Sequence, residues 1–177
     1  MTDETNLYET LYADADDQDC GLDMIEQMFQ HRDFDDISKY FDIISYNDSF
    51  STPDPAILSI VHFNLRSIRT NVDKMTAMIS SLNLPPDIIA VSENWLNESN
   101  KDSFQLNGYN SFHMVSSARI RGGVSLFVRN NINADICDNF SCVNPEIEIC
   151  TVNLTLGKEK YKVAAVYRPR SKHEHVK

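Results

Sequence analysis

The sequence predicts an α/β fold in which a strand–helix–strand unit starts a mixed sheet and antiparallel strands follow. Two observations support this prediction. Apolar runs at residues 57–63 and 87–92 have the length of buried strands, and a segment with helical spacing lies between them. Further along, strand-like segments follow one another without long helices. The 177 residues suffice for one domain with a core of its own and an additional leader.

Charge divides the chain near residue 55. Residues 1–55 carry 15 Asp and Glu against two Lys and Arg, whereas residues 56–177 carry 11 acidic and 14 basic residues. A mildly basic remainder suits a surface that meets phosphates, and it equally suits an ordinary domain surface. The acidic character therefore belongs to the front third of the chain.

The leader and the tail differ in composition from the middle of the chain. The first 19 residues are too polar to order themselves by burial. Apolar residues at helical spacing in 22–31 and 33–45 predict short amphipathic helices or partner-binding segments. We expect a mostly disordered leader with such helices at 1–55, a folded domain at 56–170 and a polar tail at 171–177.

The cysteines and the apolar runs narrow the class of protein. The four cysteines form no CxxC pair and have no histidine nearby, which argues against a zinc site. The N-terminus lacks the apolar core of a signal peptide, and no apolar run approaches the roughly 20 residues that span a bilayer. We therefore expect an intracellular chain with reduced thiols and no membrane partner.

The strand–helix–strand unit occupies residues 57–92. A β-branched apolar run at 57–63 predicts the first strand, and 87–92 predicts the second. The segment Thr70-Asn71-Val72-Asp73 has the form of a helix-capping box, and Pro85-Pro86 ends the helix. Apolar residues recur at helical spacing between them: Val72, Met75, Ile79 and Leu82. A crossover of this size makes the two strands parallel, and such a crossover is almost always right-handed.

Strands dominate the second half of the domain. Strands are predicted at 109–115 and 124–129. Residues 146–156 alternate cleanly, so that one face holds Glu148, Cys150, Val152, Leu154 and Leu156. A turn at Gly157-Lys158 leads into another apolar segment at 161–167, which predicts an antiparallel hairpin.

Two polar residues end the strands of the parallel unit. Asn64 follows the first strand, and Glu93 follows the second. Because ligands bind beyond the carboxyl ends of strands in open α/β sheets, the two side chains should lie close together. One carboxylate with neutral oxygen ligands suits Mg²⁺. Polar residues also follow strands simply because strands must end, so placement alone leaves an ordinary turn open.

Five segments resemble the endonuclease domain of non-LTR (LINE-type) retrotransposons. They are His62–Ile68, Pro86–Leu96, Leu106–Tyr109, Arg121–Arg129 and Val166–Pro169. The segments occur in the order of that family, and the resemblance covers about residues 57–170. The family belongs to the exonuclease-endonuclease-phosphatase superfamily, which includes apurinic endonucleases and DNase I-like enzymes.

The resemblance implies a fold, a reaction and site residues. The fold would be the N-terminal half of a DNase I-like four-layer α/β sandwich. Asn64 matches the active-site asparagine, Glu93 matches the glutamate that binds Mg²⁺, and Tyr167 matches the tyrosine near the scissile phosphate. The implied chemistry is metal-assisted hydrolysis of DNA phosphodiester bonds. DNA and the remainder of a retroelement polyprotein are the implied partners.

Two later motifs of the family have no counterpart in this sequence. They are a Gly-Asp-Phe-Asn type segment and a Ser-Asp-His type ending that carries the catalytic histidine. His62 lies before Asn64, and we expect it to be packed or hydrogen-bonded. We therefore expect a truncated copy that is inactive alone, and we expect the missing half to supply a second sheet. The alternatives are a non-catalytic remnant that binds nucleic acid or protein, and a lipid or sugar phosphatase.

Overall fold

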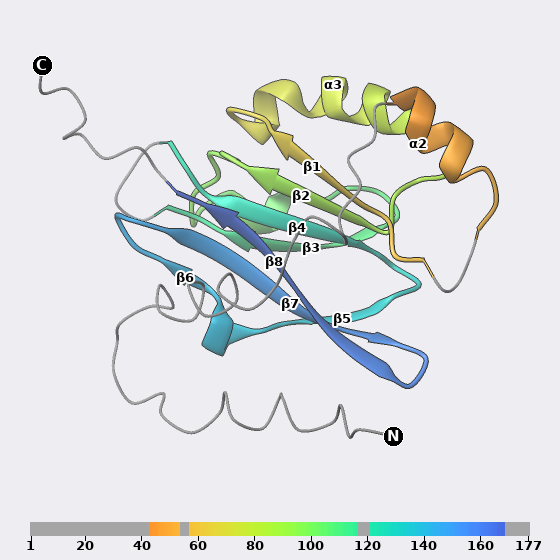
Figure 1. Ribbon diagram of the computed structural model, residues 1–177. Helices are drawn as coiled ribbons and strands as arrows, with labels where there is room; N and C mark the ends of the chain where they lie inside the picture. Colours follow the sequence, from red (N-terminus) through yellow and green to blue (C-terminus); the bar gives the residue numbers. More distant parts are fainter. Residues whose placement is uncertain (1–42, 54–56, 117–120, 169–177) are drawn as a thin grey trace, which may run out of the picture. The chain divides into compact units, whose positions relative to one another are not determined.

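The computed structural model describes residues 43–53, 57–116 and 121–168 (Figure 1). The helix predicted at 22–31 and the polar tail at 171–177 lie outside these described residues. Within them the order of elements is the one expected, with a strand–helix–strand unit first and antiparallel strands afterwards. The predicted α/β class with a mixed sheet is therefore confirmed.

The parallel unit consists of β1 (Ile60–Asn64), α3 (Ile68–Ser80) and β2 (Ile88–Ser92). β1 and β2 pair in parallel, and Asn64 lies opposite Ser92. The predicted capping box is wrong, because α3 begins two residues before Thr70 and Ser67 occupies the N-cap position. The side chain of Asn71 instead donates to the carbonyl oxygen of Leu65 at 2.8 Å, which ties the helix to the end of β1.

Four strands form the first sheet, which we call sheet A, in the order β1-β2-β4-β3. β3 spans Tyr109–Met114, β4 spans Val124–Arg129, and the short 3-10 helix η4 (Lys101–Ser103) precedes them. β4 runs antiparallel to both of its neighbours, so sheet A is mixed. β2 and β4 are buried along almost their whole length because they occupy the middle of this sheet.

A second sheet, sheet B, follows in the chain. It contains β5 (Asn133–Ile136), β6 (Cys142–Val143), β7 (Glu148–Leu156) and β8 (Glu159–Tyr167), with η5 (Asp138–Phe140) between β5 and β6. β7 pairs with all three other strands, each time antiparallel. The expectation that a missing half would supply the second sheet is therefore wrong, because this chain builds one itself.

The hairpin of β7 and β8 has the predicted turn. Leu156 lies opposite Glu159, and Gly157 between them has a φ of +62°. The alternation within β7 is also confirmed, since the face with Cys150, Val152 and Leu154 contributes to the core. The opposite face is buried at Ile149 and Thr151 as well. There Thr151 donates to the carbonyl oxygen of Phe140 in η5.

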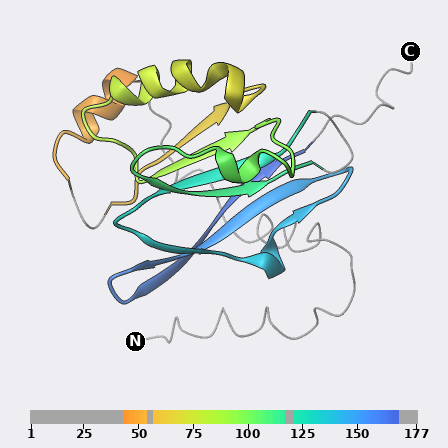
Figure 2. The same cartoon turned by 180° about the vertical axis from the view of Figure 1, so that it is seen from behind.

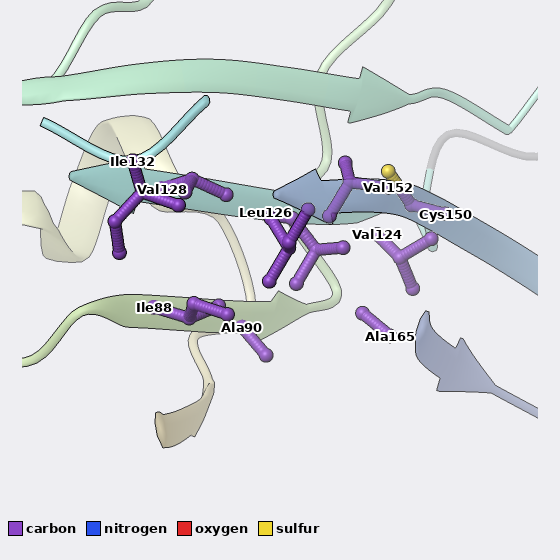
Figure 3. Packing of buried hydrophobic residues seen from close by; sticks show 10 residues of the cluster. Ile88, Ala90, Val124, Leu126, Val128, Ile132, Cys150, Val152 and Ala165 are labelled. Atoms are coloured by element: carbon purple, nitrogen blue, oxygen red, sulfur yellow. The ribbon is translucent and has the colours of Figure 1, made fainter. Parts of the chain in front are cut away.

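Apolar side chains pack on both faces of sheet A. One cluster lies between the two sheets and is shown in Figure 3; its buried residues are Ile88, Ala90, Val124, Leu126, Val128, Ile132, Cys150, Val152, Leu154 and Ala165. The other cluster lies between sheet A and α3; its buried residues are Ile68, Met75, Ile89, Val91, Leu96, Val115 and Phe127. Figure 2 shows these layers from behind, with α3 along one face of sheet A and sheet B along the other.

The helix α2 (Ile43–Ser49) lies in the segment that the sequence assigned to the leader. The side chain of Asn47 donates to Ser81 O at 3.0 Å and accepts from Asn83 N at 2.7 Å. The hydroxyl of Tyr46 donates to Leu84 O at 3.4 Å. These contacts join α2 to the turn between α3 and β2. The disorder expected for the leader before residue 43 concerns residues outside the described ranges.

The thiols differ from the expectation at one position. Cys137 and Cys150 are free and buried, and burial raises the pKa of the Cys150 thiol to about 12. Cys142 is disulfide-bonded, so the expectation that all thiols are reduced is wrong. Among the described helices, none has the length and apolar character needed to cross a membrane.

Candidate active site

Three predicted site residues meet at one carboxylate oxygen. The amide nitrogen Nδ2 of Asn64 donates to Oε1 of Glu93 at 3.0 Å. The hydroxyl of Tyr167 donates to the same oxygen at 3.2 Å. Asn64 ends β1, Glu93 follows β2, and Tyr167 ends β8. The site therefore joins both sheets, although 74 residues separate Glu93 from Tyr167.

The other carboxylate oxygen of Glu93 is open. Among the described residues, Oε2 of Glu93 has no hydrogen-bond partner. Glu93 is half-buried and Asn64 is exposed, so solvent reaches this edge of sheet A. An ionised carboxylate with one oxygen fixed by two donors and one oxygen free can bind a cation or accept a proton at the free oxygen.

The loops that carry the site have an unusual backbone. Within the described ranges, the non-glycine residues with positive φ are Arg66 (46°), Ser67 (93°), Glu93 (55°) and Trp95 (52°). All of them lie directly beyond β1 or β2. Such conformations persist only where surrounding contacts hold them, and they gather at functional sites.

Backbone hydrogen bonds hold these two loops against each other. Leu65 N donates to Ser92 O at 3.1 Å, Ser67 N donates to Glu93 O at 2.9 Å, and Ile68 N donates to Asn94 O at 2.9 Å. The parallel pairing of β1 and β2 thus continues past the ends of both strands. These hydrogen bonds between the two loops fix the distance between Asn64 and Glu93.

The Gly122-Gly123 turn supports the loop from its other side. Asn94 N donates to Gly123 O at 3.1 Å, and Trp95 N donates to Gly122 O at 2.9 Å. A Cβ atom on Gly123 would lie 2.1 Å from Oδ1 of Asn94, and Gly123 has a φ of +81°. The glycines of the Arg121–Arg129 segment are therefore needed for close approach of the turn to the Glu93 loop.

Glu148 is a polar residue of this region that the sequence analysis did not single out. Its side chain is fully buried and accepts a hydrogen bond from Gly123 N, while its Oε1 atom has no partner among the described residues. Glu148 lies directly opposite Tyr167 in the β7–β8 pairing. Its charge on an otherwise apolar face of β7 was the signal that could have identified it.

Three arginines, which we call the arginine rim, lie in the sequence next to the segments that carry the site. Arg66 follows Asn64 by two positions, and Arg168 directly follows Tyr167. The guanidinium carbon of Arg121 lies 5.2 Å from the ring centre of Trp95, a cation–π distance. In the described part of the chain none of these three arginines forms an ion pair. Such a rim favours anions such as phosphates.

The donor set fits only a loosely held divalent ion. The described residues contain no group of three or more His, Cys, Asp or Glu that could enclose a metal. Mg²⁺ keeps several waters and commonly binds to one or two carboxylates in proteins. The open Oε2 of Glu93 with the neighbouring amide of Asn64 therefore fits a hydrated Mg²⁺ and does not fit a closed structural metal site.

His62 lies near the site and is engaged elsewhere. Its Nε2 atom lies 3.1 Å from Oγ of Ser92, and burial lowers its pKa. This confirms the expectation of a hydrogen-bonded histidine.

Comparisons with known proteins give distant structural similarities. No protein-family model and no curated protein matches the chain. The APE2 catalytic domain of Xenopus laevis is 19% identical, with coverage of 67% of this chain and 47% of that chain and a TM-score of 0.44. A humanized TDP2 of D. rerio is 16% identical, with coverage of 66% and 52% and a TM-score of 0.44.

A 3′ phosphatase of Neisseria, NExo, bound to a product DNA hairpin, is 14% identical. It matches over 60% of this chain and 40% of its own, with a TM-score of 0.38. The chain thus spans about half the length of the solved structures it matches. Because identities and TM-scores are low, we draw no conclusion about activity from these similarities.

Proposed function

We propose that residues 57–168 form part of a retroelement-type endonuclease domain whose family chemistry is metal-dependent hydrolysis of DNA phosphodiester bonds. The observation that carries the proposal is the meeting of Asn64, Glu93 and Tyr167 at one carboxylate oxygen. These residues come from three separate segments of the family resemblance.

Each residue has a role in the proposal. The open oxygen of Glu93 and the amide of Asn64 would hold Mg²⁺, which when bound stabilises charge on a phosphate. The Asn64 amide and the Tyr167 hydroxyl fix the Glu93 carboxylate in one orientation. Tyr167 would also contact the scissile phosphate. Arg66, Arg121 and Arg168 would attract the phosphate backbone of DNA.

The same site lacks groups that fast hydrolysis needs. Among the described residues, no group of three or more His, Cys, Asp or Glu forms around Glu93, and Nε2 of His62 lies within hydrogen-bond distance of Ser92. A general base or acid typically contributes about 10²–10⁴-fold to the rate. We therefore expect this chain to bind DNA and a divalent ion while cleaving very slowly or not at all.

A plasmid assay with matched variants tests the proposal. With Mg²⁺, the wild-type chain is expected to nick supercoiled plasmid no faster than Glu93→Ala. In a binding assay with duplex DNA, Mg²⁺ should strengthen DNA binding by the wild type and should not change DNA binding by Glu93→Gln. Loss of the arginine charge in Arg66→Gln should weaken binding and reduce its salt dependence. Glu93-dependent nicking would contradict the expected inactivity, and absence of any Glu93-dependent metal effect would overturn the proposed site.

The alternative is a non-catalytic module that binds nucleic acid through the arginine rim. The lack of a group of three or more His, Cys, Asp or Glu among the described residues favours this alternative. It predicts DNA binding that depends on Arg66, Arg121 and Arg168 but responds equally to Mg²⁺ in the wild type and in Glu93→Gln. We further propose an intracellular location and a retroelement polyprotein as the context of the chain, on the strength of the motif resemblance.

A further inference from the structure

A buried polar network lies beneath the Glu93 loop, and the proposed chemistry does not use it. The side chain of Asn94 donates through Nδ2 to Oγ of Ser125 at 2.9 Å and to Met114 O at 3.3 Å. Nδ1 of His113 lies 2.8 Å from the same Ser125 oxygen, and Nε2 of His113 lies 3.2 Å from Phe104 O. Asn94 and Ser125 are completely buried.

The partners of this network set the direction of each hydrogen bond when His113 is neutral. The carbonyl oxygen of Phe104 can only accept, so Nε2 of His113 carries a hydrogen. In neutral histidine Nδ1 is then an acceptor, and it receives the hydroxyl hydrogen of Ser125. The Ser125 oxygen in turn accepts from Nδ2 of Asn94, which can only donate. With His113 neutral, every group of the network has a partner, whereas a protonated His113 leaves the Ser125 hydroxyl hydrogen without its acceptor.

Asn94 connects the network to the candidate site. It lies between Glu93 and Trp95, both of which have positive φ. Its Oδ1 atom accepts from Leu96 N at 2.9 Å, its own N–H donates to Gly123 O, and its carbonyl oxygen accepts from Ile68 N. Asn94 therefore holds the loop that presents the Glu93 carboxylate at both its backbone and its side chain.

We propose that His113 is a positioning residue for Glu93, which it holds through Ser125 and Asn94 while it is neutral. The role of Glu93 as a metal ligand in this inference rests on the proposed function. When His113 takes up a proton, Nδ1 becomes a donor and the Ser125 hydroxyl loses its acceptor. The hydroxyl hydrogen of the fully buried Ser125 must then turn toward another acceptor, which weakens the network that holds Asn94 and loosens the strained loop.

The surroundings of His113 set where this change occurs. The rings of Phe104 and Phe127 pack edge-on against it at centroid distances of 6.3 and 5.5 Å. Burial lowers the pKa of His113, the Phe104 carbonyl and Asp102 raise it, and Lys101 lowers it. Asp138 also lines the cavity of about 320 Å³ beside His113. Because burial is the largest of these effects, protonation should occur below the ordinary value of about 6.5.

The only tryptophan of the chain reports directly on the loop. Trp95 follows Asn94, so its fluorescence can be followed from about pH 8 to about pH 5 without any enzymatic assay. We expect a change in emission with a midpoint below about pH 6.5 while far-UV circular dichroism stays constant. His113→Asn should lack this change, because its side-chain carbonyl can accept from Ser125 and does not titrate. Ser125→Ala should show the low-pH emission at every pH.

His62→Gln is the matched control, because His62 also lies within hydrogen-bond distance of a serine near the site and also has a pKa lowered by burial. It should keep the change in emission. The inference is overturned if the wild type shows no change, if His113→Asn retains it, or if His62→Gln abolishes it. Should Ser125→Ala fail to fold, His113→Asn and His62→Gln still decide.

Titration with Mn²⁺ alone separates this inference from the proposed function. If the site binds metal, acid pH and the substitution Ser125→Ala should each weaken Mn²⁺ binding by about tenfold. This is the lower end of the loss in metal affinity that follows when a group that orients a metal ligand is removed. His113→Asn should bind Mn²⁺ equally at both pH values. If the wild type binds no Mn²⁺ but Trp95 follows His113, the proposed metal site fails and the positioning role stands.

Discussion

Glu93 adopts a left-handed backbone conformation, which for a non-glycine residue costs about 1–2 kcal/mol. The loop keeps this conformation because hydrogen bonds from neighbouring segments hold it in place. Ser67 N bonds the Glu93 carbonyl on one side, and the Gly122-Gly123 turn bonds the next two residues on the other. The strain is thus distributed over contacts that also aim the carboxylate. Substitutions at the contacts should affect the loop as much as substitutions in it.

Gly123→Ala should be far more destabilising than Gly108→Ala. Both glycines have positive φ, so each alanine carries a backbone cost of about 1–2 kcal/mol. At Gly108 the added Cβ meets nothing within 4 Å, whereas at Gly123 it collides with Asn94. Overpacking of this kind adds about 1–3 kcal/mol. Urea unfolding of the two variants measures the difference, and equal losses would contradict the close-approach explanation.

Stability should fall as the pH drops below about 6.5. Burial lowers the pKa of His113 and of His62 in the folded chain. The unfolded chain, with histidine pKa values near 6.5, then binds more protons over this range, and the free energy of unfolding decreases. The loss is complete once the pH passes below the folded pKa values, and neither histidine contributes at higher pH.

Urea midpoints measured at about pH 7.5 and about pH 5 test this dependence. His113→Asn and His62→Gln should each show a smaller decrease than the wild type. If the midpoints of both variants decreased as much as that of the wild type, groups other than these histidines would cause the decrease.

At the scale of elements, one carboxylate joins the starts of two strands to the end of a third. Oδ2 of Asp87 accepts from the backbone N and the Oγ of Ser59 at 3.0 and 2.9 Å, just before β1. Oδ1 accepts from Nη1 of Arg129 at the end of β4, at 3.2 Å. Asp87 itself immediately precedes β2. This contact lies at the end of sheet A opposite the candidate site and fixes the register of β1, β2 and β4.

Asp87→Ala should destabilise the fold by about 1.5–3 kcal/mol, the range for hydrogen bonds to a charged group. The partly exposed Arg129 contributes less than Ser59, because solvent screens its charge. The control is Glu98→Ala, which removes an exposed ion pair with Lys101 and should leave stability unchanged. Chemical denaturation compares the two variants. An Asp87→Ala variant as stable as Glu98→Ala would refute the role of this contact.

At the scale of the molecule, sheet A belongs to two cores. Its one face packs against sheet B and its other face packs against α3. Neither cluster can open without exposing a face of β2 and β4, so residues 43–168 should unfold in one cooperative step. Fluorescence of Trp95 and far-UV circular dichroism should therefore give coincident unfolding curves. Separate transitions would show that the two sheets unfold independently.

Phe127→Ala tests the same point by substitution. Phe127 is fully buried on the α3 side of β4, and its truncation should cost about 3–5 kcal/mol. Because the unit is cooperative, both spectroscopic transitions should move by the same amount. Ile44→Ala, at a side chain that is 73% exposed, should move neither. A shift of one transition alone would contradict the shared role of sheet A.

Much of the fold was predictable because it is encoded locally. The apolar runs of β1 and β2, the spacing of α3 and the alternation of β7 each follow from a few neighbouring residues. The placement of Asn64 beside Glu93 followed as well, because a short crossover makes β1 and β2 parallel. The start of α3 was misjudged because the side chain of Asn71 bonds back to Leu65, a contact that spacing does not reveal. The catalytic roles of Asn64, Glu93 and Tyr167 stay predictions.

The sequence by itself determined the α/β class, the parallel unit, the hairpin and the closeness of Asn64 to Glu93, because periodicity and residue order are local properties. Only the tertiary structure decided that the chain forms a second sheet, that Tyr167 and Asn64 share one oxygen of Glu93, and that Glu148 supports the glycine turn. It alone revealed the line from His113 through Ser125 to Asn94. These depend on pairing between strands far apart in the chain, and the sequence of either strand leaves its partner and register open.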